Sequence, residues 1–509
     1  MEHPILRFQA SGACLVRHKK QHKKTPAMAS TLKSRLPGGP AWTGSLGRIM
    51  FAACMCLALF FVLLQQEPRR FDDWDAPVYL TIAYDMKEFG TFSNGKFDLA
   101  DRRTIHPKPG MFIGPVYPAL LWIALNADHR FYNAVRCSVE SLVGRDNIAD
   151  CEAYTLPLVI MNAILLTVGL IAVGLASDVI LGFAGSFYVA PLVAAAGLMT
   201  MSGILSAVTI ESLLFCLFSM TMLFAVLAIR SASLWHYGLT GIFAGITVLA
   251  KPSFIVLAIL LVVLFALIPQ RSSGPWRRII VVLPILIVVL PWMSRNYFSV
   301  GKFGLSEEYG AAAIIERFAY NEMTLTEAGL SFLNCVPRIG PSVTKRIASA
   351  DAMLRFNWRN PNGFFRQGIG HRGALLAANG RLDPIIWPIL MREMRDNWWR
   401  YVLTTFPLAW CGLWIPSLWS LLCLPLFVGA LMLSTKRSEP ALLWAYAMPP
   451  MLLVFFHAAV MSGSSRYNIG LIGAVSVGTT YILYEVWRQA LRKFASSYAS
   501  TLVQHNSPK

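Results

Sequence analysis

Residues 47–64 read GRIMFAACMCLALFFVLL, and FDDWDAPVYLTIA follows shortly afterwards at residues 71–83. The first segment is apolar and close to the roughly 20 residues that cross a hydrocarbon core of about 30 Å. The second segment begins with three carboxylates at the point where the chain would leave the lipid. Together they predict a helix that anchors the chain in a membrane and presents acidic side chains at the membrane surface.

The composition extends this prediction to the whole chain. Hydrophobic residues make up 55% and charged residues 14%, and the mean hydropathy is +0.52, whereas a soluble globular protein carries about a quarter charged residues. No alternating pattern suggests a lipid-facing barrel, so helices are the expected spanning elements. The predicted fold class is an all-α polytopic membrane protein with two large extracytoplasmic loops that bear short amphipathic helices.

About ten transmembrane helices are expected from the apolar stretches. A further stretch, residues 400–414, adjoins Trp398 and Trp399 and is expected to lie at the membrane surface, because such aromatic belts are typical of the interface. The ten expected crossings lie near residues 47–64, 154–175, 179–199, 208–229, 236–250, 253–269, 279–294, 416–434, 440–460 and 468–487.

Basic residues indicate the orientation, because short loops rich in Lys and Arg stay in the cytoplasm. Such residues precede the first crossing, and ten crossings place four further basic segments on the same side. We therefore expect both termini inside and residues 65–153 and 295–415 outside. The formal net charge of +18 is explained by this topology and by contact with anionic lipids, so no nucleic-acid partner is expected. The four segments contain Arg230; Arg271, Arg277 and Arg278; Lys436 and Arg437; and Arg488, Arg492 and Lys493.

These boundaries divide the chain into five parts. The basic N-terminal part contains Pro and Gly and is expected to be disordered. The parts are a cytoplasmic tail at 1–46, an N-terminal transmembrane module at 47–294 that includes the first outer loop at 65–153, a second outer loop region at 295–415, C-terminal transmembrane helices at 416–487, and a cytoplasmic tail at 488–509.

The two long outer segments distinguish an enzyme from a carrier. A carrier usually keeps such loops short and places its polar groups in broken helices at the membrane midplane. Here the charges within the expected spans are few, and Asp178, Glu211 and Lys251 all lie near predicted ends. An enzyme that works at the outer membrane face is favoured, and a flippase or transporter of lipid-linked sugars remains the alternative.

The cysteines follow the same topology. Cys137 and Cys151 lie in the first outer loop and could form a local disulfide, but their spacing leaves this open. Cys335 lies in the second outer loop, and Cys411 lies beside an apolar stretch, where a cysteine is usually a small buried hydrophobe.

Asp75 begins a stretch in which Tyr79, Ala83 and Met86 recur at helical spacing. This pattern indicates a short amphipathic helix that lies along the membrane. A carboxylate at such a helix start can be held by backbone amides and aimed into a cleft, or it can serve only as a helix cap. The residues alone leave both readings open.

Asp75, Tyr79 and Ala83, directly after the first span, resemble the first-loop motif of the GT-C glycosyltransferases, in the branch of protein O-mannosyltransferases, lipid A aminoarabinose transferases and rhizobial galacturonosyltransferases. Ala76 departs from the second acid that many members have there, which puts a two-carboxylate metal site in doubt. Further segments resemble the family in the same order: 108–110 with 114–118, 211–215, 241–252, 291–297 and 465–467.

The resemblance implies transfer of a hexose or pentose, with inversion, from a polyprenyl-phosphate donor to a hydroxyl of a glycan, lipid or protein acceptor. Because the lipid phosphate is already a leaving group, the enzyme must deprotonate the acceptor and neutralise the departing phosphate. Asp75 is the candidate base. No cofactor is assigned, and a divalent metal ion is left open. The implied location is a bacterial inner membrane, with the active site facing the periplasm.

Cations at the outer boundary are the candidate ligands of the lipid phosphate. Lys108, Arg295 and Arg466 all fall there in the ten-span topology. Arg295 could instead snorkel to the headgroups, Lys108 could be an ordinary loop residue, and Glu211 could be a structural partner of a cation. The candidate substrate-binding residues are Tyr79, Lys108, Glu211, Arg295, Arg466 and Tyr467.

The topology can be tested with reporters. A reporter fused after Leu330 should behave as extracytoplasmic, because five basic segments place residues 295–415 outside. A cytoplasmic signal at this position would overturn the ten-span model and, with it, the placement of Asp75 and Arg295 on one face.

Overall fold

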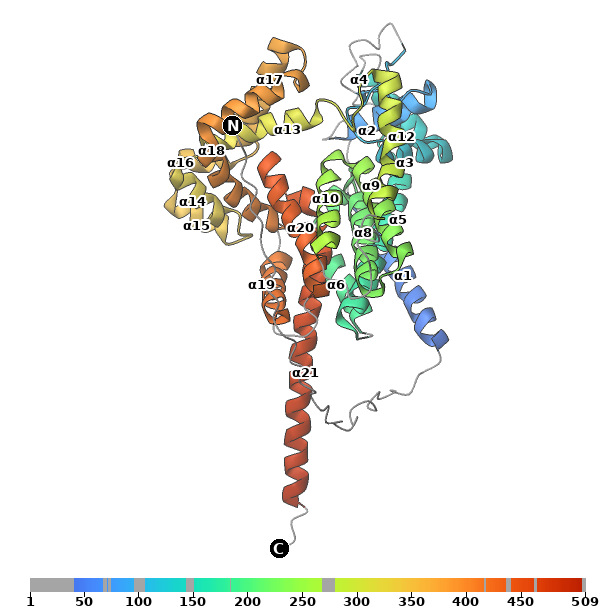
Figure 1. The fold of residues 1–509 in the computed structure, drawn as a ribbon, viewed down its shortest axis with the longest axis vertical. Helices are drawn as coiled ribbons and strands as arrows, with labels where there is room; N and C mark the ends of the chain where they lie inside the picture. The colour runs from blue at the N-terminus through green and yellow to red at the C-terminus, as the bar shows by residue number, and fades with distance from the viewer. Residues whose placement is uncertain are drawn as a thin grey trace, which may run out of the picture. The chain divides into compact units, whose positions relative to one another are not determined.

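The computed structural model describes residues 41–66, 71, 75–95, 106–142, 151–183, 185–267, 280–415, 418–435, 441–461 and 465–505. Within these ranges the chain forms helices and no strand, as Figure 1 shows. The all-α prediction is therefore confirmed. The predicted tail at 1–46 lies outside the described residues, except for its last residues, which already belong to α1 (Ala41–Leu64).

Five helices are long and apolar enough to cross a membrane, and one bent pair of helices also passes if it is counted as a single broken span. The pair consists of α18 (Asp383–Leu413) and α19 (Leu418–Ser434). Residues 400–413, which were expected to lie at the membrane surface, form the last part of α18. This part begins after a kink at Asn397, whose backbone dihedrals are not helical. The five helices are α1, α5 (Leu156–Leu181), α8 (Glu211–Ser231), α12 (Val282–Val300) and α20 (Ala441–Val460).

The remaining expected crossings correspond to shorter helices or to part of a longer one, so the count of ten stays a prediction. Gly182 ends α5 with a φ of +71°, and α6 begins only at Ser186. Pro252 lacks the N–H that would continue α9, so this helix ends at Ala250. These elements are α6 (Ser186–Met199), α7 (Ser202–Leu205), α9 (Leu234–Ala250), η4 (Pro252–Phe254), α10 (Ile255–Leu267) and α21 (Leu471–His505).

Helices α5, α8 and α9 pack side by side and form the centre of the N-terminal bundle (Figure 1). Gly169 of α5 permits the close approach to α8, because a Cβ added there would lie 2.6 Å from the ring of Phe215. Small residues at helix contacts are the usual means of bringing backbones together in a membrane, where burial against lipid supplies little driving force.

The two segments that are predicted to lie outside, residues 65–153 and 295–415, keep the names first and second outer segment. The first contains α2 (Ala76–Glu88), α3 (Val116–Ala127) and α4 (His129–Leu142). The expected helix is α2, which begins directly after Asp75, and its placement along the membrane stays a prediction. Most of α2 is buried, because Leu80 and Ala83 pack in the main core together with Tyr117 and Leu121 of α3. A helix that is enclosed on several sides needs apolar residues on all of its faces, so its sequence no longer shows one clearly apolar and one clearly polar face.

The second outer segment carries short helices, as the sequence predicts. Four of its tryptophans are exposed: Trp358, Trp387, Trp398 and Trp399. The helices before α18 are α13 (Tyr309–Phe318), η5 (Ala319–Glu322), α14 (Leu325–Asn334), α15 (Gly340–Ile347), α16 (Ala350–Phe356) and α17 (Phe364–Asn379).

Two disulfides brace the outer segments. Cys137 pairs with Cys151, one of the alternatives that the sequence left open. Cys335 pairs with Cys411 and joins the end of α14 to α18. The expectation that Cys411 is only a small buried hydrophobe is therefore wrong. The apolar stretch around it gave no sign of a partner 76 residues away.

Loss of the Cys335–Cys411 disulfide should weaken the second outer segment. We expect Cys335→Ser to lower the free energy of unfolding by about 2–4 kcal/mol, because the bridge restricts the unfolded chain. Thermal unfolding in detergent measures this, and Cys54→Ser, which removes a free cysteine, is the matched control. Alkylation of both cysteines without a reductant would show that the bridge is absent.

Candidate functional site

Asp75 occupies the N-cap position of α2, but its side chain makes no capping hydrogen bond. Instead, its Oδ2 accepts a hydrogen bond of 2.6 Å from Nη2 of Arg466. The Asp75 side chain is 45% exposed. The contacts of the Asp75 side chain therefore do not fit its interpretation as a helix cap. The first turn of the helix also contains Pro77, which has no N–H to offer.

Arg466 links Asp75 to a second carboxylate. Its Nε lies 3.6 Å from Oε1 of Glu211, whose side chain is only 2% exposed. Burial opposes the charge on Arg466, but Tyr467, Glu211 and Asp75 together outweigh burial and raise its pKa above the usual range. Glu211 opens α8, where the helix dipole favours a negative charge. One guanidinium thus joins the starts of α2 and α8.

The short helix η6 (Ser465–Asn468) holds Arg466 in this position. The amide of Asn468 donates a hydrogen bond of 3.1 Å to the carbonyl of Gly412 in α18. Its Oδ1 lies 3.0 Å from Nδ1 of His457 in α20. Gly412 is required for this approach, because a Cβ there would lie 2.6 Å from the Asn468 amide.

Lys251 brings a second cation to the same place. Its Nζ lies 3.7 Å from the ring centroid of Tyr467, and the residue is buried between α9 and η4. Burial lowers the pKa of Lys251 to about 7, and of the nearby charges Glu211 opposes this shift while Arg466 adds to it. The Lys251 amine is therefore desolvated and faces the same aromatic ring as the Arg466 guanidinium.

Tyrosines surround these charges. The ring of Tyr79 meets that of Tyr117 edge-on at 4.9 Å. Burial raises the pKa of Tyr309 well above its usual range, and the next contributions come from nearby Tyr467 and Asp75. Tyr309 opens α13, so the second outer segment also reaches the site.

Three buried polar atoms here have no hydrogen-bond partner among the described residues: Tyr117 Oη, Glu211 Oε2 and His457 Nε2. Buried polar groups normally have partners, because an unpaired one costs about 1–3 kcal/mol. Their concentration beside a half-exposed carboxylate and two cations indicates a place that binds a polar ligand.

Arg295 does not join this group through its hydrogen bonds. It donates to the carbonyls of Gly110 and Phe92 at 2.6 and 3.0 Å, and its guanidinium stacks on Trp292 of the same helix. It therefore braces the first outer segment against α12. Lys108 is exposed. Of the three cations expected to converge on one anion, Arg466 is the one bound to Asp75.

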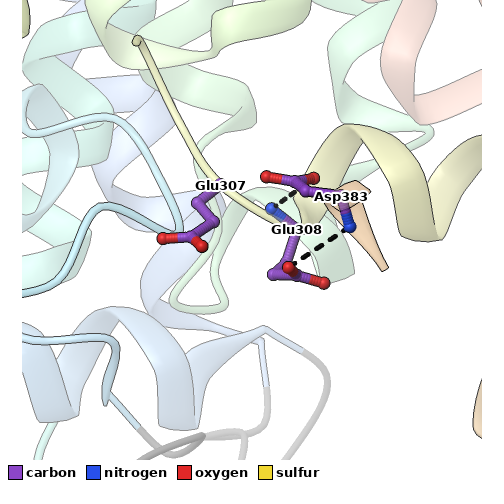
Figure 2. A group of neighbouring side chains, drawn as sticks. All are labelled: Glu307, Glu308 and Asp383. Atoms are coloured by element: carbon purple, nitrogen blue, oxygen red, sulfur yellow. Dashed lines mark hydrogen bonds between the residues drawn. The ribbon is translucent and has the colours of Figure 1, made fainter. Parts of the chain in front are cut away.

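Glu307, Glu308 and Asp383 form a separate acidic cluster, shown in Figure 2. Their carboxylate oxygens lie close enough together to hold a metal ion. Several of these oxygens already have partners. The amides of Leu382 and Asp383 donate to Glu308, and the Glu308 amide donates to Asp383. Arg381 forms ion pairs with Glu307 and Glu308. The cluster ties the starts of α13 and α18 together.

Of the candidates predicted from sequence, Asp75, Tyr79, Glu211, Arg466 and Tyr467 lie in this one site. Sequence reasoning did not include Lys251, Tyr309 and His457. The sequence did contain a signal for Lys251. A lysine between two apolar stretches is energetically unfavourable beside lipid, so it usually has a functional or structural role. Tyr309 carried none, since only the path of the chain brings it to the site.

No family model and no curated protein matches this chain. Among solved structures, the chain is similar to ArnT from Cupriavidus metallidurans, which was crystallised bound to undecaprenyl phosphate. The two sequences are 16% identical, the match covers 86% of this chain and 78% of that chain, and the TM-score is 0.34. At this level of similarity, neither a family nor an activity can be assigned to the chain from the likeness alone.

Proposed function

We propose that this protein is a membrane glycosyltransferase of the GT-C type, which transfers a sugar from a polyprenyl-phosphate donor to an acceptor hydroxyl at the outer membrane face. The observation that carries the proposal is the half-exposed carboxylate of Asp75, bound to Arg466 at 2.6 Å beside buried Glu211. A base and a phosphate-binding cation are the two groups that this reaction needs.

Asp75 is the proposed general base. One of its carboxylate oxygens, Oδ2, is held by Arg466 at 2.6 Å. The exposed side of the carboxylate can then accept the proton of an acceptor hydroxyl. The oxygen of this hydroxyl forms the new bond to the anomeric carbon as the bond to the lipid phosphate breaks, which inverts the configuration of that carbon.

Arg466 and Lys251 are the proposed ligands of the lipid phosphate. Both contact Tyr467, so their charges reach the same region. An arginine offers five N–H donors in a fixed fork, which suits a phosphate, and a lysine adds a point charge. Charge that develops on the departing phosphate is stabilised most strongly where water is excluded, as it is around the buried Lys251.

The unpartnered atoms of Tyr117, Glu211 and His457 are the proposed contacts of the sugar. Hydroxyl groups of a sugar both donate and accept, so they can satisfy a carboxylate oxygen, a phenol and a ring nitrogen. Tyr79 lines the same space through its contact with Tyr117. Lys108, on the first outer segment, and Arg295, in the last turns of α12, stay as proposed secondary contacts.

The proposed location is a bacterial inner membrane with the site facing the periplasm. In the ten-span topology, Asp75, Glu211, Lys251, His457 and Arg466 all fall at the outer boundary. Sugar donors on this side must be carried by lipid, since nucleotide sugars stay in the cytoplasm. The proposed acceptor is a glycan, a lipid or a protein.

Removal of the base should abolish turnover. Asp75→Asn keeps the size of the side chain but cannot accept the proton, so we expect the transfer rate to fall by about 10² to 10⁴-fold. The measurement is the release of polyprenyl phosphate from a labelled lipid-linked sugar in proteoliposomes, at saturating donor.

Two other carboxylates of the sequence provide controls for that experiment. Asp72→Asn and Glu140→Gln, the latter on α4 and paired with Arg136, should retain near-normal rates. Near-normal turnover by Asp75→Asn would show that Asp75 is not the base. Movement of the sugar across the membrane without release of polyprenyl phosphate would identify a flippase instead.

Binding of the donor should depend on pH through Lys251. Its pKa of about 7 means that the amine is charged below this pH and neutral above it. We therefore expect the donor KM to rise as the pH increases through about 7. Lys251→Arg keeps the charge at every pH tested and should flatten this part of the profile. The same rise of KM in Lys251→Arg would exclude Lys251 as its source.

A further inference from the structure

Arg317 is a fully buried cation outside the proposed site. Its side chain is 0% exposed and belongs to α13. Its guanidinium bridges α13, α18 and α20, and among the described residues its hydrogen bonds all go to neutral oxygens. These are Ala458 O at 2.8 Å, Asn321 Oδ1 at 3.0 Å, Tyr401 O at 3.3 Å, Thr404 Oγ1 at 2.9 Å and Thr405 Oγ1 at 3.2 Å.

Arg317 acts as a cap on the C-terminal end of α20. The last four carbonyls of a helix have no partner within the helix, and α20 ends at Val460. Arg317 binds the carbonyl of Ala458, and the hydroxyl of Tyr401 binds that of Ala459. A cation at this end also interacts favourably with the helix dipole. Two side chains from the second outer segment thus hold the last turn of α20.

The capped last turn of α20 contacts η6, because Nδ1 of His457 lies 3.0 Å from Oδ1 of Asn468. Shortly after Val460 the chain enters η6, which carries Arg466 and Tyr467. At its other end, α13 begins with Tyr309, which lies near Asp75 and Tyr467. Arg317 therefore joins two segments, each of which contributes a side chain to the site.

We propose that Arg317 is a positioning residue that holds η6, and with it Arg466, against Asp75 and Glu211. The cost of burying its charge is offset by the dense set of hydrogen bonds. An apolar side chain would fill the space without fixing the end of α20. The expected effect of Arg317 on the transfer rate rests on the proposed function. Its expected effect on the position of η6 does not.

Hydrogen exchange tests the structural part without any turnover. In the full-length protein in detergent, Arg317→Met should speed amide exchange in the peptide that covers residues 465–470, because the turn of α20 that contacts η6 through His457 and Asn468 loses its cap. Arg355→Met is the matched control, since Arg355 is a cation of the same outer segment that pairs with Glu327. Equal exchange of this peptide in wild type and Arg317→Met would overturn the proposal.

Milder variants cover the case in which Arg317→Met does not fold. Arg317→Lys retains the charge and one bond to the carbonyls, so it should show an intermediate increase in exchange. Tyr401→Phe removes only the hydroxyl that binds Ala459 and should act in the same direction. No change of exchange at residues 465–470 in either variant would contradict the positioning role.

A double-mutant cycle tests the part that concerns rates. Arg317→Met should reduce kcat/KM by on the order of 10- to 100-fold, as expected for a displaced catalytic group. If Arg317 acts through Arg466, the Arg317→Met/Arg466→Met protein should be no slower than Arg466→Met alone. Fully additive losses would show that Arg317 acts elsewhere. A wild-type protein without transfer activity would refute the proposed function and leave the exchange result unaffected.

Discussion

A single guanidinium between two carboxylates is the interaction on which the arrangement of the site depends. Arg466 contacts Asp75 at one helix start and Glu211 at another. Because Glu211 is buried, its charge would be very unfavourable without this partner. The cluster also brings together segments that lie far apart in the sequence: the first outer segment, the central bundle and the end of the C-terminal helices.

The bilayer imposes the second constraint. Inside lipid, every backbone polar group must be satisfied by the chain itself, so spanning segments are helices, and irregular backbone is tolerated only where protein encloses it. The site follows this rule, because its side chains come from places where helices begin, end or break. Asp75 precedes α2, Glu211 opens α8, Lys251 separates α9 from η4, and Arg466 lies in η6. These are also the positions where charged side chains can reach one another.

The sequence predicted the fold class and part of the site for identifiable reasons. The length of the apolar stretches predicted the helices. Asp75, Glu211 and Arg466 stood out because each lies beside an apolar stretch and within a segment that resembles a family motif. The role of Arg317 could not be predicted, since an arginine in a polar outer segment resembles any exposed one until the path of the chain buries it. For the same reason, the hydrogen bonds of Arg295 to the carbonyls of Gly110 and Phe92 could not be predicted. The burial of α2 depended on packing with α3 and α4, which one-dimensional patterns do not contain.

The contact between Asp75 and Arg466 joins residues 391 positions apart, and this separation has a consequence for biosynthesis. A chain made from its N-terminus inserts its early helices long before residue 466 has been synthesised. The first outer segment can fold around α2 and carry its aspartate, but the cationic half of the pair arrives only with the final membrane helices. A nascent or truncated chain therefore holds an unmatched acid and no assembled centre. Synthesis of the last segment becomes the step that completes the protein.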